Sequence, residues 1–327
     1  MELVSQLIPL LSDKGNIIVV DSSDNKNEVL INKENVSYIR SSHKNQPYQR
    51  YLGYLATDAN VLFFFDDDME VEDEQFIDKI LAMFQQDAKL SGIAVKFKNK
   101  HENTSIAKIP NSKIKIKNNA LKKFKNWFTG YPQLPDGAFG YCGNKGKQPI
   151  GGGKTNWVWG PSFVFKHSAA FKNFNFQLLD MFEEKLGMGE DAILGYGASK
   201  DGYLKFHDEL FLIHNDQNNS TYTSNFKTYA KRVAFSRYYL SKEKARLDKA
   251  NTIFPILHYI WYMHWRILGY FFNYIIRPNK SRKEMLSGFV NGFLLTFTYK
   301  WKSFSASETY WKKEAQTDLH KNKSKYE

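Results

Sequence analysis

The chain has 327 residues, of which 42% are hydrophobic and 16% aromatic, so it can bury a sizeable core and is not intrinsically disordered. Its net charge of +12 arises entirely within residues 216–327, which hold 20 basic and 8 acidic side chains, whereas residues 1–215 hold 26 of each sign. This asymmetry excludes a uniformly basic surface and predicts an acidic partner, anionic lipid or nucleic acid, for the C-terminal third.

Helical and strand patterns alternate along the first hundred residues. Apolar residues at helical spacing predict a helix over residues 2–12, which lacks the basic leader of a secretory signal. The segments predicted after it are, in order, a strand at 16–21, a strand at 36–40, a helix opened by Asn45 and Pro47, a strand at 61–65, a helix carrying Phe76 to Phe84 and a strand at 91–97. The alternation favours a doubly wound α/β layer, in which ligands bind at the carboxyl ends of the strands.

The rest of the chain is less regular. Residues 98–156 are rich in Lys, Gly and Pro, and we interpret them as a long, partly mobile insertion. A short helix is expected to begin after Gly189, and residues 204–216 are expected to form a pair of strands. A change to aromatic, basic and helical composition near residue 220 predicts two regions, residues 1–220 and residues 221–327.

Three consecutive aspartates, Asp66, Asp67 and Asp68, follow the apolar run at 61–65. An Asp-x-Asp pair at a strand end holds its carboxylates close together, as hard cations such as Mg²⁺ or Mn²⁺ require when they bridge a diphosphate. The alternative is an acidic helix start, because more acidic residues follow directly. The placement at the end of a buried strand favours the metal site.

Two further acidic residues and one histidine are candidates for chemistry. Glu190 and Asp191 follow a glycine turn, from which a carboxylate can act as a general base toward a hydroxyl, although acidic residues are also ordinary in a first helical turn. His214 comes after an apolar run and is either a metal ligand or a hydrogen-bonded strand end.

Residues 252–278 combine many aromatic side chains with basic ones and almost no acids. Pro255 and Arg266 interrupt the ~20-residue window that a spanning helix needs. An amphipathic helix lying in the membrane interface fits the pattern better, and a core helix packed on the first region remains the alternative. The lone Cys142 excludes an internal disulfide and fits a reducing compartment. We therefore predict a cytoplasmic protein, peripheral on the inner face of the cell membrane.

Taken together, residues 1–215 resemble the family 2 inverting glycosyltransferases of the GT-A fold. The stretch NIIVVDSS resembles the family's second strand, and QRYLGYLATDANVLFFFDDDMEV resembles its Arg-containing helix followed by the Asp-x-Asp strand. WGPSFVFKHS resembles the strand near the acceptor, and GEDAILGYGASKDGY the Glu-Asp helix. The family's first strand, with its Pro-Thr-Tyr-Asn-like turn, has no counterpart after Met1. Gly197 and Ala198 stand where the family commonly has Arg and Leu.

The resemblance implies a role for each candidate. Asp21 would contact the base or ribose of a nucleotide-diphosphate sugar, with Arg50 and Asp67 on the nucleotide side. Asp66 and Asp68 would bind the nucleotide and a divalent metal, Mn²⁺ or Mg²⁺, and His214 would complete the metal site. Asp191 would be the catalytic base, with Glu190 beside it, for transfer with inversion to an acceptor hydroxyl.

The predicted partners are a nucleotide sugar, a saccharide or lipid-linked acceptor of envelope polysaccharide synthesis, and an anionic membrane surface bound by the C-terminal region. No nucleic-acid-binding module is visible, so nucleic acid is not expected. The main alternative is a non-catalytic, membrane-associated remnant of a transferase. A hydrolase with paired carboxylates is disfavoured, because the aspartates are adjacent and not set across a cleft.

Overall fold

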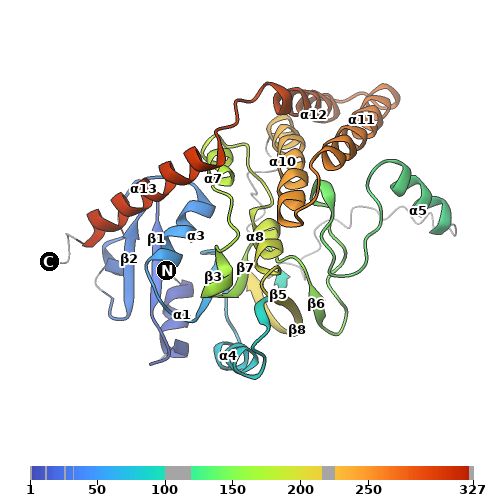
Figure 1. Cartoon of the computed structure of the whole chain (residues 1–327). Helices are drawn as coiled ribbons and strands as arrows, with labels where there is room; N and C mark the ends of the chain where they lie inside the picture. The colour runs from blue at the N-terminus through green and yellow to red at the C-terminus, as the bar shows by residue number, and fades with distance from the viewer. Residues whose placement is uncertain are drawn as a thin grey trace.

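The computed structural model describes residues 2–99, 119–215 and 225–323, except residues 12, 26 and 32. The elements predicted for the first hundred residues are all present (Figure 1). They are α1 (Glu2–Leu11), β1 (Ile17–Asp21), α2 (Glu28–Ile31), β2 (Val36–Arg40), α3 (Gln46–Leu55), β3 (Val61–Phe65), β4 (Met69–Glu70), α4 (Phe76–Gln86) and β5 (Leu90–Asn99).

The beginning of α3 shows how local chemistry sets an element. The Asn45 side chain accepts a hydrogen bond from the backbone N–H of Tyr48, and Pro47 lies in the first turn, where its missing N–H costs nothing. The predicted start of this helix is therefore confirmed, and it fixes the position of Arg50 one turn further on.

The middle of the chain differs from two predictions. It contains α5 (Asn119–Phe128), the short 3₁₀ helix η1 (Tyr141–Gly143), β6 (Gly153–Thr155), β7 (Ser162–Lys166), α6 (His167–Ala170), α7 (Gln177–Glu183), α8 (Glu190–Ala198) and β8 (Tyr203–His214).

Part of the predicted insertion at 98–156 is regular: α5, η1 and β6 lie within it, while residues 100–118 fall outside the described residues. The helical spacing of the apolar residues in α5 was not recognised, because lysines lie between them. The strand pair expected at 204–216 is one strand, because residues 208–210 form an irregularity in the pairing with β5 instead of a turn.

Six strands form a mixed sheet in the order β3, β7, β5, β8, β4, with β6 also paired to β8. The β5–β8 pair is parallel, and the other pairs in this sheet are antiparallel. β1 and β2 form a separate parallel pair. Between the two sheets lies a cavity of about 1000 Å³, lined by every residue of β1 and β3 together with parts of α1 and α3.

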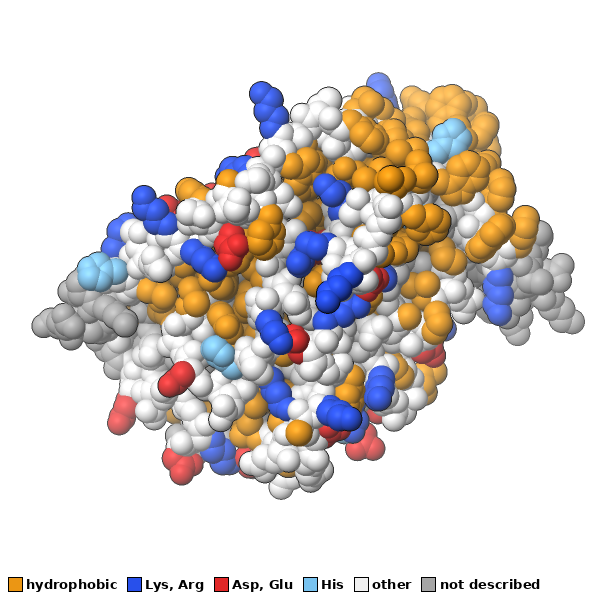
Figure 2. All heavy atoms as spheres, in the orientation of Figure 1, with side chains coloured by type: hydrophobic (Ala, Val, Ile, Leu, Met, Phe, Trp, Pro, Cys, Tyr) orange, Lys and Arg blue, Asp and Glu red, His pale blue; other side chains and the backbone are white. Residues whose placement is uncertain are grey.

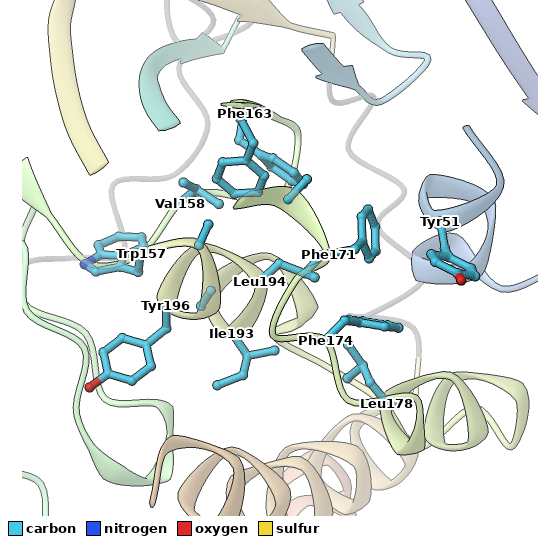
Figure 3. Packing of buried hydrophobic residues seen from close by; sticks show 14 of the residues in the cluster. Tyr51, Trp157, Val158, Phe163, Phe171, Phe174, Leu178, Ile193, Leu194 and Tyr196 are labelled. Carbon is cyan, nitrogen blue, oxygen red and sulfur yellow. The ribbon is translucent and has the colours of Figure 1, made fainter. Parts of the chain in front are cut away.

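Helices cover both faces of the large sheet. Phe163 and Phe165 of β7 point into a core shared with α3, α7 and α8, while Val164 between them points into a second core with α1 and α4. Figure 3 shows the first core, in which Phe163 and Val158 lie on one side of α8 and Ile193 points from its other side. The side-chain alternation of one strand therefore joins two layers of helices.

The C-terminal region comprises α10 (Phe226–Leu247), α11 (Ile253–Ile276), α12 (Lys280–Thr298) and α13 (Phe304–Lys323). α10, α11 and α12 gather at one end of the molecule, and α13 returns along β2 (Figure 1). Trp311 of α13 is 1% exposed and donates a hydrogen bond from Nε1 to Asp180 Oδ1 at 3.0 Å. Residues on both sides of position 220 thus share one core, and the division into two regions stays a prediction.

Two glycines bring α12 unusually close to α10. A Cβ added to Gly288 would lie 2.3 Å from the carbonyl oxygen of Lys227, and one added to Gly292 would lie 2.4 Å from that of Lys231. The atoms of α10 that face these glycines belong to the backbone or to small side chains such as that of Ala234. Across the part of the chain that the structure describes, no helix is both long and apolar enough to span a membrane.

Candidate active site

The three aspartates occupy the turn between β3 and β4. The backbone N–H of Asp66 donates to the carbonyl of Pro161 at 2.8 Å, and the carbonyl of Asp68 accepts from the N–H of Asn215 at 2.9 Å. The turn is therefore held between the start of β7 and the end of β8. Asp67 is exposed at its tip.

Arg50 joins this turn to α8. Its side chain is only 8% exposed, and Nη2 donates at 2.9 Å both to Asp66 Oδ1 and to the carbonyl of Gly160. Its Nη1 lies 3.3 Å from Glu190 Oε1. Gln46, one turn earlier on α3, also donates to Asp66 Oδ1, at 2.9 Å. One face of α3 thus holds two carboxylates that are far apart in sequence.

Burial governs the charges of these carboxyl groups. Desolvation raises the pKa of Asp66, and the neighbouring guanidinium of Arg50 opposes that rise. Desolvation also raises the pKa of Glu190, with a further upward contribution from the adjacent Asp191. The site therefore holds buried acidic groups at a cost in stability, and one cation offsets part of that cost.

Asp68 and His214 form a second contact. His214 Nε2 lies 3.2 Å from Asp68 Oδ2, because Met69 of β4 pairs with His214 at the end of β8. The other oxygen, Asp68 Oδ1, is buried and has no hydrogen-bond partner among the described residues. A carboxylate oxygen without a partner beside an imidazole is a donor set that fits a divalent cation.

No cluster of three or more His, Cys, Asp or Glu within residues 2–99, 119–215 and 225–323 could hold a metal by itself. Asp68 and His214 would therefore supply two ligands, and a bound diphosphate and water would supply the remainder, as Mg²⁺ commonly requires. Asp66, predicted to share the metal, has one oxygen engaged by Arg50 and Gln46, and its metal role stays a prediction.

Asp191 is the second residue of α8. The helix begins after Gly189, whose φ of 80° lies in the left-handed region that glycine adopts without strain. Lys145 places its Nζ 3.6 Å from Asp191 Oδ2 and 4.7 Å from the ring centroid of Trp157. A Cβ on Gly160 would lie 3.8 Å from the same carboxylate oxygen, so the absence of a side chain there keeps the space beside Asp191 open.

Asp21 ends β1 and lines the cavity that Arg50 and the three aspartates also line. Its carboxylate accepts hydrogen bonds from the Tyr38 hydroxyl, from Ser23 and, at 2.9 Å, from Arg40 Nη1. Burial raises the pKa of Asp21, but these donors outweigh burial and the net shift is downward. Asp21 is thus an ionised group that lines the same cavity as Asp66.

The structure brings only part of the predicted set into contact, since Asp21 pairs with Arg40 and Asp191 with Lys145. Arg50 links Asp66 to Glu190, and His214 contacts Asp68. Sequence reasoning missed Gln46 and Lys145. Gln46 stands four residues before Arg50 on the same helix face, a spacing that could have identified it. Nothing in the sequence around Lys145 points to Asp191, because the two meet through the tertiary fold.

Residues 3–146 match the family model described as Glycosyl transferase family 2. This segment is a family 2 glycosyltransferase domain. The match and the mixed sheet flanked by helices confirm the predicted α/β GT-A fold. The matched residues include Asp21, Arg50 and the three aspartates, whereas Glu190, Asp191 and His214 lie beyond them. The family transfers a sugar from a nucleotide sugar.

Three solved structures are similar to this chain over most of its length. Residues 1–349 of TarS from S. aureus share 12% identity at a TM-score of 0.46, covering 99% of this chain and 87% of that one. The mannosyltransferase PcManGT from Pyrobaculum calidifontis, solved with GDP-Man and Mn²⁺, shares 8% at 0.43, with coverages of 90% and 83%. A mycobacterial protein shares 8% at 0.37, with coverages of 76% and 72%. The comparison with curated proteins gave no match.

Proposed function

We propose that this glycosyltransferase is metal-dependent and inverts the configuration of the sugar that it transfers to an acceptor hydroxyl. The observation that carries the proposal is the chain of contacts from the Asp-x-Asp turn through Arg50 to the acidic pair at the start of α8. This chain of contacts supports a donor site and a base that lie within one arrangement.

The donor would bind at the carboxyl ends of β1 and β3. Asp21, fixed as an ionised carboxylate by Tyr38 and Arg40, would accept hydrogen bonds from the base or ribose. Arg50 and Asp67 would lie on the nucleotide side of the same cavity. Asp68 and His214 would hold the divalent metal, Mn²⁺ or Mg²⁺, which when bound stabilises the negative charge of the departing diphosphate.

Asp191 would act as the base. Its carboxylate would take the proton of the acceptor hydroxyl as that oxygen attacks the anomeric carbon from the face opposite the leaving group, and the configuration at that carbon would invert. Lys145 would orient this carboxylate through the contact at 3.6 Å. Glu190, paired with Arg50, would fix the start of α8 and thereby the position of Asp191.

We propose a saccharide or lipid-linked acceptor of envelope polysaccharide synthesis, used by an enzyme peripheral on the inner face of the cell membrane. This part of the proposal rests on the basic and aromatic composition of the C-terminal region. The non-catalytic alternative predicts that no nucleotide binds, so a binding measurement separates the two.

The experiment is a thermal-shift titration with UDP, GDP, dTDP and CMP, each with and without Mn²⁺. A ligand that binds only the folded state raises the melting temperature by mass action. We expect metal-dependent stabilisation by one nucleotide, lost in Asp68→Ala and retained in Asp136→Asn, which changes an exposed aspartate elsewhere. A cooperative melt that no nucleotide shifts would overturn the proposal and favour the non-catalytic alternative.

A further inference from the structure

A band of exposed apolar side chains runs along α11 and continues onto α5. Its members, which we call the α5–α11 band, are each at least 40% exposed: Phe124, Trp127 and Phe128 on α5, and Ile253, Phe254, Leu257, Trp261, Phe271, Phe272, Ile275 and Ile276 on α11. Figure 2 shows hydrophobic side chains gathered at this end of the molecule, at the upper right. A cluster of this size on a folded protein marks an interaction surface.

The two helices present the band as one surface. Trp261 donates a hydrogen bond from Nε1 to the carbonyl of Phe128 at 2.6 Å. The ring of Phe128 lies 5.6 Å from that of Trp261 and 5.1 Å from that of Trp265. These contacts fix α5 against α11, so the exposed rings of both helices face the solvent together.

The opposite face of α11 is already occupied. Tyr259, Tyr262 and Met263 are each at most 3% exposed and pack in a core with α10 and α12. α11 therefore has two apolar faces, one packed against the protein and one exposed to solvent. Such a helix can lie along a surface but cannot be surrounded by lipid.

Among the described residues, basic side chains predominate around the band, and Glu284 at the start of α12 pairs with one of them, Lys280, at 4.0 Å. Neither α5 nor α11 contains an acidic residue, and exposed basic side chains flank the band. They are Lys123 and Lys125 on α5, Arg277 just after α11, and Lys280 and Lys283 at the start of α12. A second copy of the chain seated on this surface would bring like charges together, whereas anionic headgroups would complement them.

We propose that the α5–α11 band inserts into the interface of an anionic lipid bilayer, with its aromatic and aliphatic side chains among the acyl chains and the flanking Lys and Arg on the headgroups. Aromatic rings and basic side chains are the groups that favour this depth of a bilayer. The surface lies outside the candidate active site. The inference therefore rests on the membrane-peripheral part of the proposed function, which it makes specific, and not on the transferase activity.

Co-sedimentation with vesicles tests the proposal. We compare vesicles of phosphatidylcholine alone with vesicles that also contain phosphatidylglycerol. The wild type is expected to bind the anionic vesicles more tightly, with an affinity that falls as salt rises. The combined variant Trp127→Ser, Phe272→Ser, Ile276→Ser is expected to lose about tenfold or more in partitioning, because three exposed apolar side chains no longer insert.

Two controls keep the test specific. Ile150→Ser removes an apolar side chain that is 91% exposed outside the band, and it should bind as the wild type does. The pair Arg277→Gln, Lys280→Gln should weaken binding to anionic vesicles by roughly fivefold for each charge removed, and leave binding to neutral vesicles unchanged. Circular dichroism melts check that each variant folds.

Three outcomes would overturn the proposal. The first is a wild type that does not bind anionic vesicles. The second is a band variant that binds as tightly as Ile150→Ser does. The third is a wild-type dimer that the band substitutions convert to a monomer, which would assign the surface to self-association. Vesicle binding needs no nucleotide, so failure here is distinct from failure of the transferase proposal.

Discussion

Arg50 Nη1 of α3 lies 3.3 Å from Glu190 Oε1 of α8, and the two residues are 140 positions apart in sequence. The same guanidinium holds Asp66 of the Asp-x-Asp turn. One buried cation thus positions both the Asp-x-Asp turn, where the donor is proposed to bind, and the start of α8, which carries the proposed base. Changes to Arg50 should therefore affect stability and activity together.

Arg50→Met should lower the free energy of unfolding by about 3–5 kcal/mol at pH 7.5, because Asp66 and Glu190 lose the cation that offsets their burial. The loss should be smaller at pH 5, where the raised pKa values allow these carboxyls to be protonated. Urea unfolding at both pH values measures this. Arg277→Met, at an exposed position, serves as the control. Equal losses at the two pH values would contradict the account.

The free energy of unfolding of Glu190→Gln should increase relative to that of the wild type as the pH rises. Burial raises the folded-state pKa of Glu190 above its unfolded value, so the unfolded chain releases the proton first. The wild type therefore loses stability as pH rises from the unfolded pKa through the folded pKa, and the variant avoids this loss. Unfolding free energies of the two proteins should agree near pH 4 and diverge by pH 7.5. A constant difference across that range would show that Glu190 does not titrate as described.

Asp191→Asn should reduce kcat by roughly 10²–10⁴-fold, the usual contribution of a positioned general base. Nucleotide binding should persist, because the ion pair of Asp191 is with Lys145 and not with a residue of the Asp-x-Asp turn. Initial rates with the identified donor, alongside the nucleotide thermal shift, separate the two effects. Loss of nucleotide binding in this variant would instead place Asp191 on the donor side.

Two glycine substitutions in helices should have opposite effects. Gly53→Ala should stabilise by about 0.5–1 kcal/mol, since alanine favours the helix and its Cβ would meet Val20 at an ordinary 3.6 Å. Gly292→Ala should destabilise by about 1–3 kcal/mol, because its Cβ would lie 2.4 Å from the carbonyl oxygen of Lys231. Urea denaturation of both variants provides the measurement. A stabilised Gly292→Ala would mean that α10 and α12 do not pack as closely as described.

The sequence predicted the elements that position the site better than the contacts within it. A continuous apolar run located β3, apolar residues on one side of a helix located α4, and Asn45 and Pro47 marked where α3 begins. These are local signals that depend on spacing along the chain. Strand order and direction were less accessible, because pairing such as β5 with both β7 and β8 depends on segments far apart in sequence.

The partners of the candidate residues came from the fold alone. Nothing near Arg50 in sequence indicates Glu190, and Lys145 meets Asp191 from within a segment that we had interpreted as an insertion. α5 was missed for a similar reason, because its lysines conceal an apolar face that is recognisable once Phe128 lies against Trp261. Long-range packing decides such contacts, and single-sequence patterns do not record it.

The most direct measurement is a titration of Mn²⁺, with free metal followed by electron paramagnetic resonance, in the presence of the nucleotide that stabilises the protein. The account predicts one bound Mn²⁺ per chain, weakened by about tenfold or more in His214→Ala, since a lost ligand costs at least as much as a lost supporting contact. His264→Ala, which changes an exposed histidine on α11, should bind Mn²⁺ as the wild type does. Unchanged Mn²⁺ affinity in His214→Ala and Asp68→Ala would contradict the metal-dependent site at the centre of this account.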